Sequence, residues 1–268
     1  MDESAELGLA AVLDALNPYS DDLMLVGGWV PYLYARNLEA SPWAGLLTTD
    51  IDLAVPRRLV VRGQTVDALM KGIDFEDAFR SVDQPPLVKY VGSIAGADVE
   101  VEFLTTEQGN REGVKVVQSG LHATALHYVD VLLEHPFRID VALAGRLVQV
   151  AVPSPAAFLL QKGLVFPRRK IRDKKAKDLY CVFDVWHSCT PWRSWIIEQL
   201  GESMRAEKPQ YLAKCAGNLA RYCSDVSGDG IRMLVEQRPA TLLSEMDDDQ
   251  FSQYAWGMME EVQQLLTG

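Results

Sequence analysis

The chain has 268 residues, of which 48% are hydrophobic and 24% are charged, so it can bury an ordinary core and does not have a disordered composition. This length allows one large domain or two ordinary ones. The net charge of −11 argues against a protein that coats nucleic acid over a broad face. A local basic groove remains compatible with it, because a site responds mainly to nearby charges.

The amino terminus is acidic and lacks the basic and apolar segments of a signal peptide. No apolar run approaches the roughly 20 residues that a membrane span requires. We therefore expect a soluble, cytoplasmic protein without a membrane partner. The cysteines show neither C-x-x-C nor zinc-finger spacing and are expected to be buried free thiols: Cys181, Cys189, Cys215 and Cys223.

The first half of the chain mixes helical and strand patterns. Residues 4–16 have apolar positions at helical spacing, and residues 23–26 are a short apolar strand that runs through Gly27-Gly28 into a helix over 29–38. A loop over 39–47 and a helix near 64–71 are also expected. Residues 123–134 fit a helix or a strand equally well. Further strands are predicted over 50–55, 87–92, 98–104, 114–118, 137–142 and 146–152.

The pattern changes at Pro153-Ser154-Pro155 and is nearly all helical afterwards. Mixed strands and helices followed by a run of helices predict the α+β class, with a mixed-sheet domain over 1–152 and a helical domain over 153–268. The expected helices lie near 154–165, 172–187, 191–205, 209–224, 230–237 and 248–266.

Asp50 and Asp52 lie two residues apart on a predicted strand, so both side chains project from the same side of the pleat. Such a pair can simply face solvent. Here the flanking residues over 51–55 are otherwise apolar, and two like charges in a core strand are costly unless a cation compensates them. The pair therefore suggests a site for a divalent cation.

Gly27-Gly28 follows the first strand and precedes a helix. Two glycines there can form a tight turn and nothing more, and they match neither the G-x-G-x-x-G fingerprint nor the P-loop. The order of the parts carries the signal: strand, Gly-Gly, helix, loop, strand, Asp-x-Asp. Free N–H groups at the start of the helix suit a triphosphate.

A third carboxylate is expected from a neighbouring strand, because two-metal phosphoryl chemistry uses a further ligand or a base. The segment 98–104 supplies acids on one face and valines on the other. Glu102 is favoured because it lies deepest in the apolar segment, with Glu100 as the alternative. Asp98 fits a solvent-facing edge.

Three stretches together resemble the core of the DNA polymerase β-type nucleotidyltransferase superfamily: Val26-Gly27-Gly28-Trp29, Thr49-Asp50-Ile51-Asp52-Leu53 and Val101-Glu102-Phe103-Leu104-Thr105. Later stretches resemble the branch that holds the AbiEii-type toxins and the bacterial GSU-type nucleotidyltransferases. These are residues 127–133, 152–158, Lys162 and 174–179. The similarity covers about residues 22–186.

The resemblance implies a mixed-sheet nucleotidyltransferase core and a role for each matching residue. Gly27 and Gly28 would hold the triphosphate of a nucleotide. Asp50 and Asp52 would ligate Mg²⁺, with Mn²⁺ as a substitute, and Glu102 would be the third catalytic and metal-binding acid. Lys162 and the pair Lys177-Asp178 would lie beside the triphosphate, with Asp178 orienting a lysine.

Seven basic residues fall within positions 168–177, opposed only by Asp173. They can form a solvated helix face, or they can neutralise phosphates of the nucleotide or of a nucleic-acid acceptor. The sequence leaves open the acceptor, which can be RNA such as tRNA, a protein hydroxyl or a small molecule, and the oligomeric state.

The leading hypothesis is an enzyme that moves a nucleoside monophosphate from a nucleoside triphosphate to an acceptor hydroxyl with release of pyrophosphate. Two alternatives come from other classes. Gly-Gly stands where many superfamily members have Gly-Ser, and Glu102 where aspartate is usual, so the chain can also be a nucleotide- or RNA-binding module without turnover. It can also be an interaction protein, such as half of a toxin–antitoxin pair whose basic segment meets an acidic partner.

Overall fold

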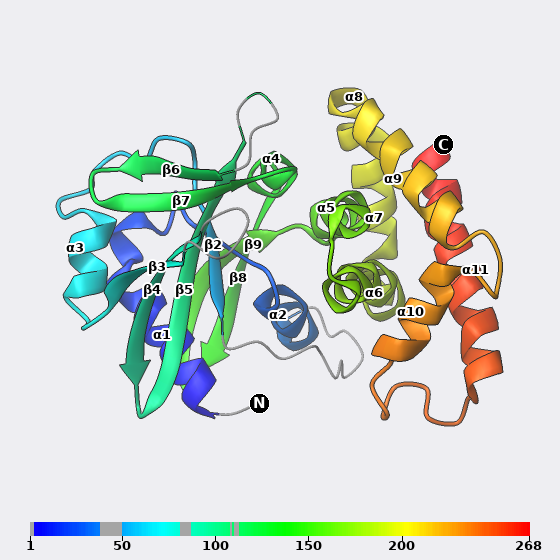
Figure 1. The fold of residues 1–268 in the computed structure, drawn as a ribbon, viewed down its shortest axis with the longest axis horizontal. Helices are drawn as coiled ribbons and strands as arrows, with labels where there is room; N and C mark the ends of the chain where they lie inside the picture. The colour runs from blue at the N-terminus through cyan, green and yellow to red at the C-terminus, as the bar shows by residue number, and fades with distance from the viewer. Residues whose placement is uncertain (1–2, 38–49, 81–86, 108, 110–112) are drawn as a thin grey trace. The chain divides into compact units, whose positions relative to one another are not determined.

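The computed structural model describes residues 3–37, 50–80, 87–107, 109 and 113–268. The chain divides into two compact units, the first formed by Met1–Leu33 with Leu47–Ser154 and the second by Tyr34–Leu46 with Pro155–Gly268. The first contains a mixed sheet and the second is helical, which confirms the predicted α+β class (Figure 1). The loop predicted over 39–47 lies outside the described residues.

The sheet of the first unit combines parallel and antiparallel neighbours in the order β1-β2-β5-β4-β3, with β7 pairing β5 and β6. β2 runs parallel to β5 and antiparallel to β1, and β4 and β5 form the predicted hairpin. Its strands are β1 (Met24–Val26), β2 (Ile51–Ala54), β3 (Glu76–Arg80), β4 (Leu87–Ile94), β5 (Ala97–Thr106), β6 (Gly113–Gln118) and β7 (Leu121–Leu126).

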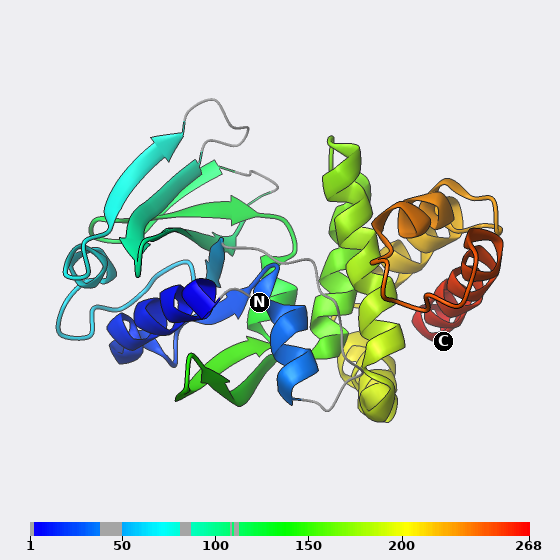
Figure 2. The same ribbon diagram turned by 90° about the horizontal axis from the view of Figure 1, so that it is seen from below.

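One face of this sheet packs on helix α1 (Glu3–Ala15), which lies along it beside α3 (Val66–Lys71) (Figure 2). Gly8 of α1 comes so close that an added Cβ would lie 2.8 Å from Val99 Cγ2. The opposite face packs on α4 (Val129–Leu133), and the apolar cluster there includes Val26, Ala54 and Leu132. The two faces of the sheet therefore have separate apolar contacts.

Helix α2 (Trp29–Asn37) starts directly after Gly27-Gly28, as the sequence predicts. Pro31 lies in its first turn, where the missing N–H costs no helical hydrogen bond. The turn places Gly27 in the left-handed region at φ +75°. A residue with a side chain is strained there, so the turn requires glycine at this position.

Two further elements complete the first unit: the 3₁₀ turn η1 (Asn17–Tyr19) and the hairpin of β8 (Pro136–Leu143) and β9 (Arg146–Pro153). The predicted hairpin over 137–152 is confirmed, and it turns through Ala144 and Gly145, both at positive φ.

Two stretches of the first unit differ from the sequence-based expectation. Residues 123–134, which fit a helix or a strand, contain both: β7 ends at Leu126 and α4 begins at Val129, with Tyr128 between them at φ 63°. Strand β3 was not predicted. Its sequence Glu-Asp-Ala-Phe-Arg lacks an apolar alternation, and it is a strand because it pairs with β4.

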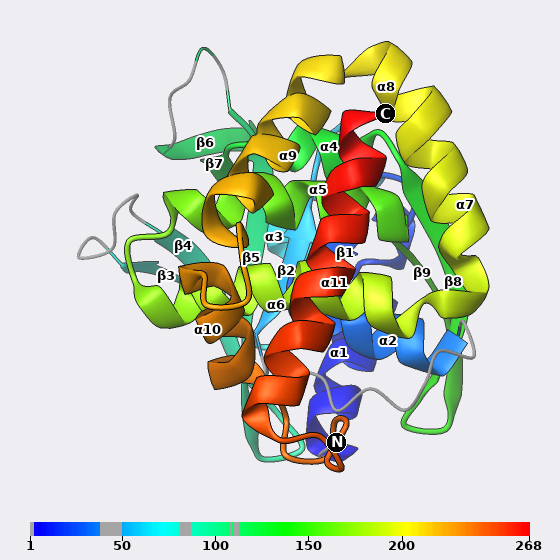
Figure 3. The same ribbon diagram turned by 90° about the vertical axis from the view of Figure 1, so that its right-hand side faces the viewer.

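The second unit is built of helices, and Figure 3 shows its C-terminal helix, in red, nearest the viewer. Helix α6 packs against α5 and α10, and α11 packs against α9. The longer helices are α5 (Pro155–Val165), α6 (Arg172–Ser188), α9 (Pro209–Tyr222), α10 (Asp229–Gln237) and α11 (Asp248–Thr267), and the 3₁₀ turn η2 (Phe166–Arg168) links α5 to α6.

The single helix predicted over 191–205 is instead four short elements: η3 (Thr190–Trp192), α7 (Arg193–Glu198), the π-helical η4 (Gln199–Ser203) and α8 (Met204–Glu207). The π turn contains Gly201, a poor helix former that lowers the cost of departing from α geometry.

All four cysteines are free and buried in this unit, as the sequence predicts. Burial raises the pKa of each thiol, to about 12. Among the helices that the structure describes, none combines the length and the apolar character needed to cross a bilayer.

Candidate functional site

The sheet register brings two of the expected carboxylates together. Asp52 of β2 and Glu102 of β5 are Cα partners in a parallel pair, so their side chains leave the same face of the sheet on neighbouring strands. This is the face that α4 covers further along, where Ala54 and Leu104 follow two residues later. The apolar part of the face stops at the two acids, and both side chains are partly exposed.

The glycine turn lies beside the first of these acids. Because β1 is antiparallel to β2, its last residue Val26 is the Cα partner of Asp52, and Gly27 follows directly. A Cβ added to Gly27 would lie 2.0 Å from Asp52 Oδ2, well inside the distance that real Cβ atoms allow. The Val30 N–H donates to the Gly27 carbonyl at 3.4 Å, which closes the turn into α2. The backbone of the turn therefore lies directly against the carboxylate.

Asp50 precedes β2 and is half-exposed. Lys89 of β4 lies close to it, with Nζ 3.8 Å from Asp50 Oδ2 and 2.7 Å from Glu100 Oε2. Lys89 is also the Cα partner of Glu102 across the β4–β5 hairpin. One row of partners thus runs Val26, Asp52, Glu102 and Lys89 across four strands.

Lys89 was not singled out from the sequence. It is buried, with 8% of its surface exposed. Burial lowers the pKa of its ammonium, but Glu100, Asp50 and Glu102 together outweigh burial and raise the pKa above its usual value. Lys89 is therefore a charged lysine among carboxylates. Residues 87–92 show no polar alternation, and only the register of the β4–β5 hairpin places Lys89 on the same face as the two glutamates.

Two of the three residues expected to meet phosphate in the second unit, Lys162 and Asp178, form an ion network with Arg169 around the buried Asp178 carboxylate. Lys162 Nζ of α5 lies 2.7 Å from Asp178 Oδ1 of α6, and Arg169 Nε lies 2.6 Å from Asp178 Oδ2. Burial raises the pKa of the Asp178 carboxyl, but the charges of Lys162 and Arg169 outweigh it, so the pKa is lowered overall. Burial also opposes the charge of Lys162, and Asp178 raises the pKa of its ammonium overall. Asp178 thus holds two cations, and Arg169 is a member that the sequence reasoning did not single out.

Lys177 lies apart from this network. It is exposed, and its Nζ pairs with Asp173 Oδ2 one helical turn earlier at 3.1 Å. Arg172 is likewise paired, with Asp229 at 3.0 Å and Glu236 at 2.9 Å, both on α10. Part of the basic segment therefore binds carboxylates of its own unit, which reduces the excess positive charge that the sequence suggests.

The acidic residues of the first unit fit a hard divalent cation by their chemistry. Carboxylate oxygens are the ligands that Mg²⁺ prefers, and Asp52 and Glu102 present them from one face of two adjacent strands. Asp50 adds a carboxylate two residues before Asp52. Because Gly27 has no side chain, its backbone can lie directly against the Asp52 carboxylate.

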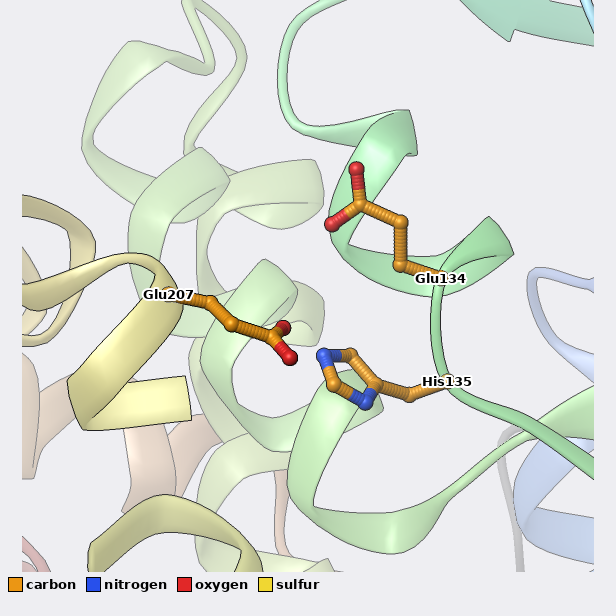
Figure 4. A group of neighbouring side chains, drawn as sticks. All are labelled: Glu134, His135 and Glu207. Carbon is orange, nitrogen blue, oxygen red and sulfur yellow. The ribbon is translucent and has the colours of Figure 1, made fainter. Parts of the chain in front are cut away.

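A second group of metal-ligating residue types consists of Glu134 and His135, which follow α4, and Glu207, which ends α8 (Figure 4). Glu134 and His135 belong to the first unit and Glu207 to the second. Both glutamates are exposed, and exposed acids commonly gather without an ion. We infer no metal site from them.

The structure brings together a mixed sheet, a glycine turn and acids on two adjacent strands, the features from which the sequence predicts a nucleotidyltransferase core. The comparison with protein families makes this specific. A family model described as nucleotidyltransferase matches residues 7–191, and the chain belongs to this family. The match includes every candidate residue named above on β1, β2, β4 and β5.

No curated protein matches the chain. Among solved structures, it is similar to the crystal structure of an antigenic nucleotidyltransferase-like protein from Paracoccidioides brasiliensis. The two are 18% identical, the likeness covers 79% of this chain and 93% of the other, and the TM-score is 0.39. Membership of the nucleotidyltransferase family therefore rests on the family match.

Proposed function

We propose that the chain is a Mg²⁺-dependent nucleotidyltransferase that moves a nucleoside monophosphate from a nucleoside triphosphate to an acceptor hydroxyl. The observation that carries this proposal is the direct pairing of Asp52 with Glu102 beside the Gly27 turn. Membership of the nucleotidyltransferase family supports the same kind of chemistry. The narrower resemblance to AbiEii-type and GSU-type proteins stays a prediction.

Asp50, Asp52 and Glu102 would hold the ion, which when bound neutralises phosphate charge and orients the triphosphate. Gly27 and Gly28 would let the backbone approach the phosphates, and the N-terminus of α2 would offer N–H groups to them. Lys162 is a charged ammonium held by Asp178, and we propose that it and Lys177 bind phosphate.

In the proposed reaction the acceptor hydroxyl oxygen forms a bond to the α-phosphorus. The bond from the α-phosphorus to the oxygen that bridges to the β-phosphate breaks, and pyrophosphate leaves with that electron pair. The hydroxyl proton passes to the Glu102 carboxylate, which is partly exposed and can release it to water. Atoms and charge balance without any further reactant.

The test is transfer of label from each of the four α-³²P-labelled ribonucleoside triphosphates to total RNA or to protein, with Mg²⁺ present. The paired variants are Glu102→Gln and Asp98→Asn. Both residues lie on the same face of β5, four positions apart, and Asp98 is exposed near the start of the strand. We expect Glu102→Gln to reduce transfer by at least about a hundredfold and Asp98→Asn to leave it unchanged.

The alternative is a nucleotide- or RNA-binding module without turnover. It would bind triphosphate, transfer no label, and bind equally after Asp52→Asn. The third reading, half of a toxin–antitoxin pair, concerns the partner of the basic segment and is compatible with catalysis. The ion pairs of Arg172 weaken it, because this charge already has two carboxylate partners, Asp229 and Glu236.

A further inference from the structure

Tyr222, the last residue of α9, contacts two cations of the second unit. Lys175 Nζ of α6 lies 5.3 Å from the centre of the Tyr222 ring and donates to its hydroxyl at 3.4 Å. Arg221 Cζ lies 5.5 Å from the same centre. Phe166 of η2 packs edge-to-face on this ring, with the two ring centres 5.1 Å apart. A single aromatic ring therefore orders two cations that come from separate helices.

The segment between Phe166 and Lys175 carries three further basic residues that are exposed: Arg168, Lys170 and Lys174. Both ends of this segment contact Tyr222, so the segment stays close to the ring. The Tyr222 cluster is the set of five cations gathered here: Arg168, Lys170, Lys174, Lys175 and Arg221. All five lie within Pro155–Gly268 of the second unit, and Arg221 and Tyr222 lie beyond the residues 7–191 that the family model matches.

The nearby carboxylates do not neutralise this cluster. Those on α6 and α10 are each paired with a cation outside the cluster: Asp173, Asp178, Asp229 and Glu236. Asp225, in the loop after α9, accepts hydrogen bonds from the hydroxyls of Ser224 and Ser227. Within the part of the chain that the structure describes, no carboxylate forms an ion pair with a cation of the cluster. The cluster therefore keeps its positive charge on a chain whose net charge is −11.

We infer that the Tyr222 cluster binds the phosphodiester backbone of a nucleic-acid strand, and that this strand is the acceptor of the proposed transfer. The inference rests on the proposed function, because it names the acceptor class that the function leaves open. A strand carries one negative charge at each nucleotide, so it can meet several cations at once. The hydroxyl at the end of the strand supplies the attacking oxygen.

The order of the cations favours a bound phosphate chain. Lysine and arginine lose side-chain freedom when they bind an anion, and the Tyr222 ring removes part of that freedom beforehand. The competing partner is an acidic peptide. Its carboxylates lie on flexible side chains at irregular spacing, whereas the phosphates of a strand repeat regularly along one backbone. Contacts to phosphates carry no sequence information, so we expect binding that depends strongly on salt and weakly on sequence.

The first experiment measures binding of a fluorescent RNA of about 20 nucleotides to the full chain by anisotropy, without nucleotide or divalent ion. Five phosphate contacts should make the affinity fall about a hundredfold between about 50 and 200 mM salt. Arg221→Gln should weaken binding about fivefold at about 100 mM salt, because it removes one such contact. Lys175→Gln combined with Arg221→Gln should weaken it about 25-fold and make the salt dependence shallower.

The matched control is Arg232→Gln, which removes the same charge from an exposed arginine of the same unit. Arg232 pairs with Asp229 at 3.5 Å, so its charge already has a carboxylate partner. We expect its affinity for RNA to stay within about twofold of the original chain. Equal losses in Arg221→Gln and Arg232→Gln would overturn the assignment of the cluster, because the RNA would then respond only to net charge.

Two competitors identify the kind of partner. A DNA of the same sequence should displace the RNA, because both strands present the same phosphates. A poly-glutamate peptide of equal charge should displace it at least about tenfold less well. A peptide that competes as well as the DNA would identify an acidic protein as the partner and contradict the proposal. Transfer of label to the RNA or to the DNA then shows which strand is the acceptor.

The ring is tested without any change of charge. Tyr222→Leu keeps both cations and should weaken RNA binding about threefold with the same salt dependence, while Tyr222→Phe keeps the ring and should bind like the original chain. Unchanged affinity in Tyr222→Leu would contradict the role given to the ring. Where Tyr222→Leu does not fold, the pair Arg221→Gln and Arg232→Gln still decides the question.

Failure of the proposed function looks different from failure of this inference. Asp52→Asn should bind RNA like the original chain and transfer no label to it. If the original chain binds RNA through the cluster but transfers no label to any acceptor, the proposed function fails and the surface stands. If label passes to protein while neither strand binds, the proposed function stands and the inference is wrong.

Discussion

Gly27 and Asp52 are in direct contact, and the contact leaves no room for a side chain. A Cβ on Gly27 would lie 2.0 Å from Asp52 Oδ2 and 2.9 Å from its Cγ. The contact exists because β1 and β2 are antiparallel, so the end of β1 meets the start of β2. Gly27 therefore has two roles: it turns the chain into α2, and it leaves room for the carboxylate of Asp52, which is proposed to hold an ion.

We expect Gly27→Ala to abolish Mn²⁺ binding, because the new methyl group must displace the Asp52 carboxylate. It also pays the backbone cost of a side chain at φ +75°, about 1 kcal/mol. The matched control is Gly145→Ala, at φ +77° with nothing within 4 Å of the added Cβ. Both variants should lose similar stability in urea unfolding from the backbone strain. Equal Mn²⁺ affinity in the two would contradict the role of the contact.

The network around Asp178 predicts a large effect on stability. Asp178→Asn leaves Lys162 and Arg169 without the carboxylate that holds them, and breaking a buried pair from one side costs about 3 kcal/mol. Asp173→Asn is the control, since Asp173 lies on the same helix in an exposed pair with Lys177 and should change the free energy of unfolding by under about 0.5 kcal/mol. Urea unfolding of both variants at pH 7 measures the difference.

The same network predicts how stability depends on acid. The pKa of Asp178 is lower in the folded chain, so its contribution is present above the unfolded pKa of about 4 and is lost as the pH falls through the folded pKa. We expect the stability difference between the original chain and Asp178→Asn to shrink as the pH is lowered below about 4. A difference that stays constant down to pH 2 would show that Asp178 acts through packing and not through its charge.

Much of this arrangement was predictable from local sequence, and the remainder depends on contacts between distant segments. The apolar strand before Gly27-Gly28 and the alternation around Asp52 and Glu102 identify those elements directly. The adjacency of β2 and β5 does not follow from the sequence, because β3 and β4 lie between them in the chain. It is that adjacency which makes Asp52 and Glu102 partners.

Lys89 and β3 are two further features that local sequence does not reveal, because both depend on pairing between strands. A lone lysine in an apolar strand is usually a solvated residue, and only the β4–β5 register shows that Lys89 lies beside acids. Strand β3 has a mixed polar sequence and exists through its pairing with β4. In the second unit, the sequence shows Arg169 only as one charge of a basic segment, whereas the structure pairs it with the buried carboxylate of Asp178.

For Asp184 of α6 we expect the free energy of unfolding to depend on pH in the opposite direction to that expected for Asp178. It is 3% exposed, and Ser188 Oγ donates to its Oδ1 at 3.1 Å. Burial raises the pKa of this carboxyl well above its usual range, against the smaller opposing effect of Ser188. The folded chain therefore holds the proton more tightly than the unfolded chain does. Its contribution is present below the unfolded pKa of about 4 and is lost progressively as the pH rises.

Asp184→Asn has nearly the same shape and no charge at any pH. We expect it to be more stable than the original chain at pH 8 by at least about 1 kcal/mol, and to differ little at pH 4. Urea unfolding at the two pH values measures this. An Asp184→Asn chain that is less stable at pH 8 would mean that the buried carboxyl is not a net cost to the fold.

The packing of α5 on α9 predicts a change in stability that comes from steric contact and not from charge. A Cβ on Gly163 would lie 2.3 Å from Cys215 Sγ but 3.9 Å from Cys215 Cβ, so the clash involves the sulfur atom alone. The Gly163 carbonyl also accepts a hydrogen bond from Asn218 Nδ2 at 2.9 Å, which limits how far the helices can separate. Gly163→Ala should therefore destabilise the chain by about 1–3 kcal/mol through overpacking.

Cys215→Ala removes the sulfur and leaves ordinary van der Waals distance to the new methyl group. The double variant Gly163→Ala with Cys215→Ala should be more stable than the sum of the two single changes, by about 1 kcal/mol or more in a double-mutant cycle. Additive effects would mean that Gly163 is required by something other than the sulfur. Because alanine also favours the helical conformation over glycine, relief of the clash should let the methyl group contribute to the stability of α5.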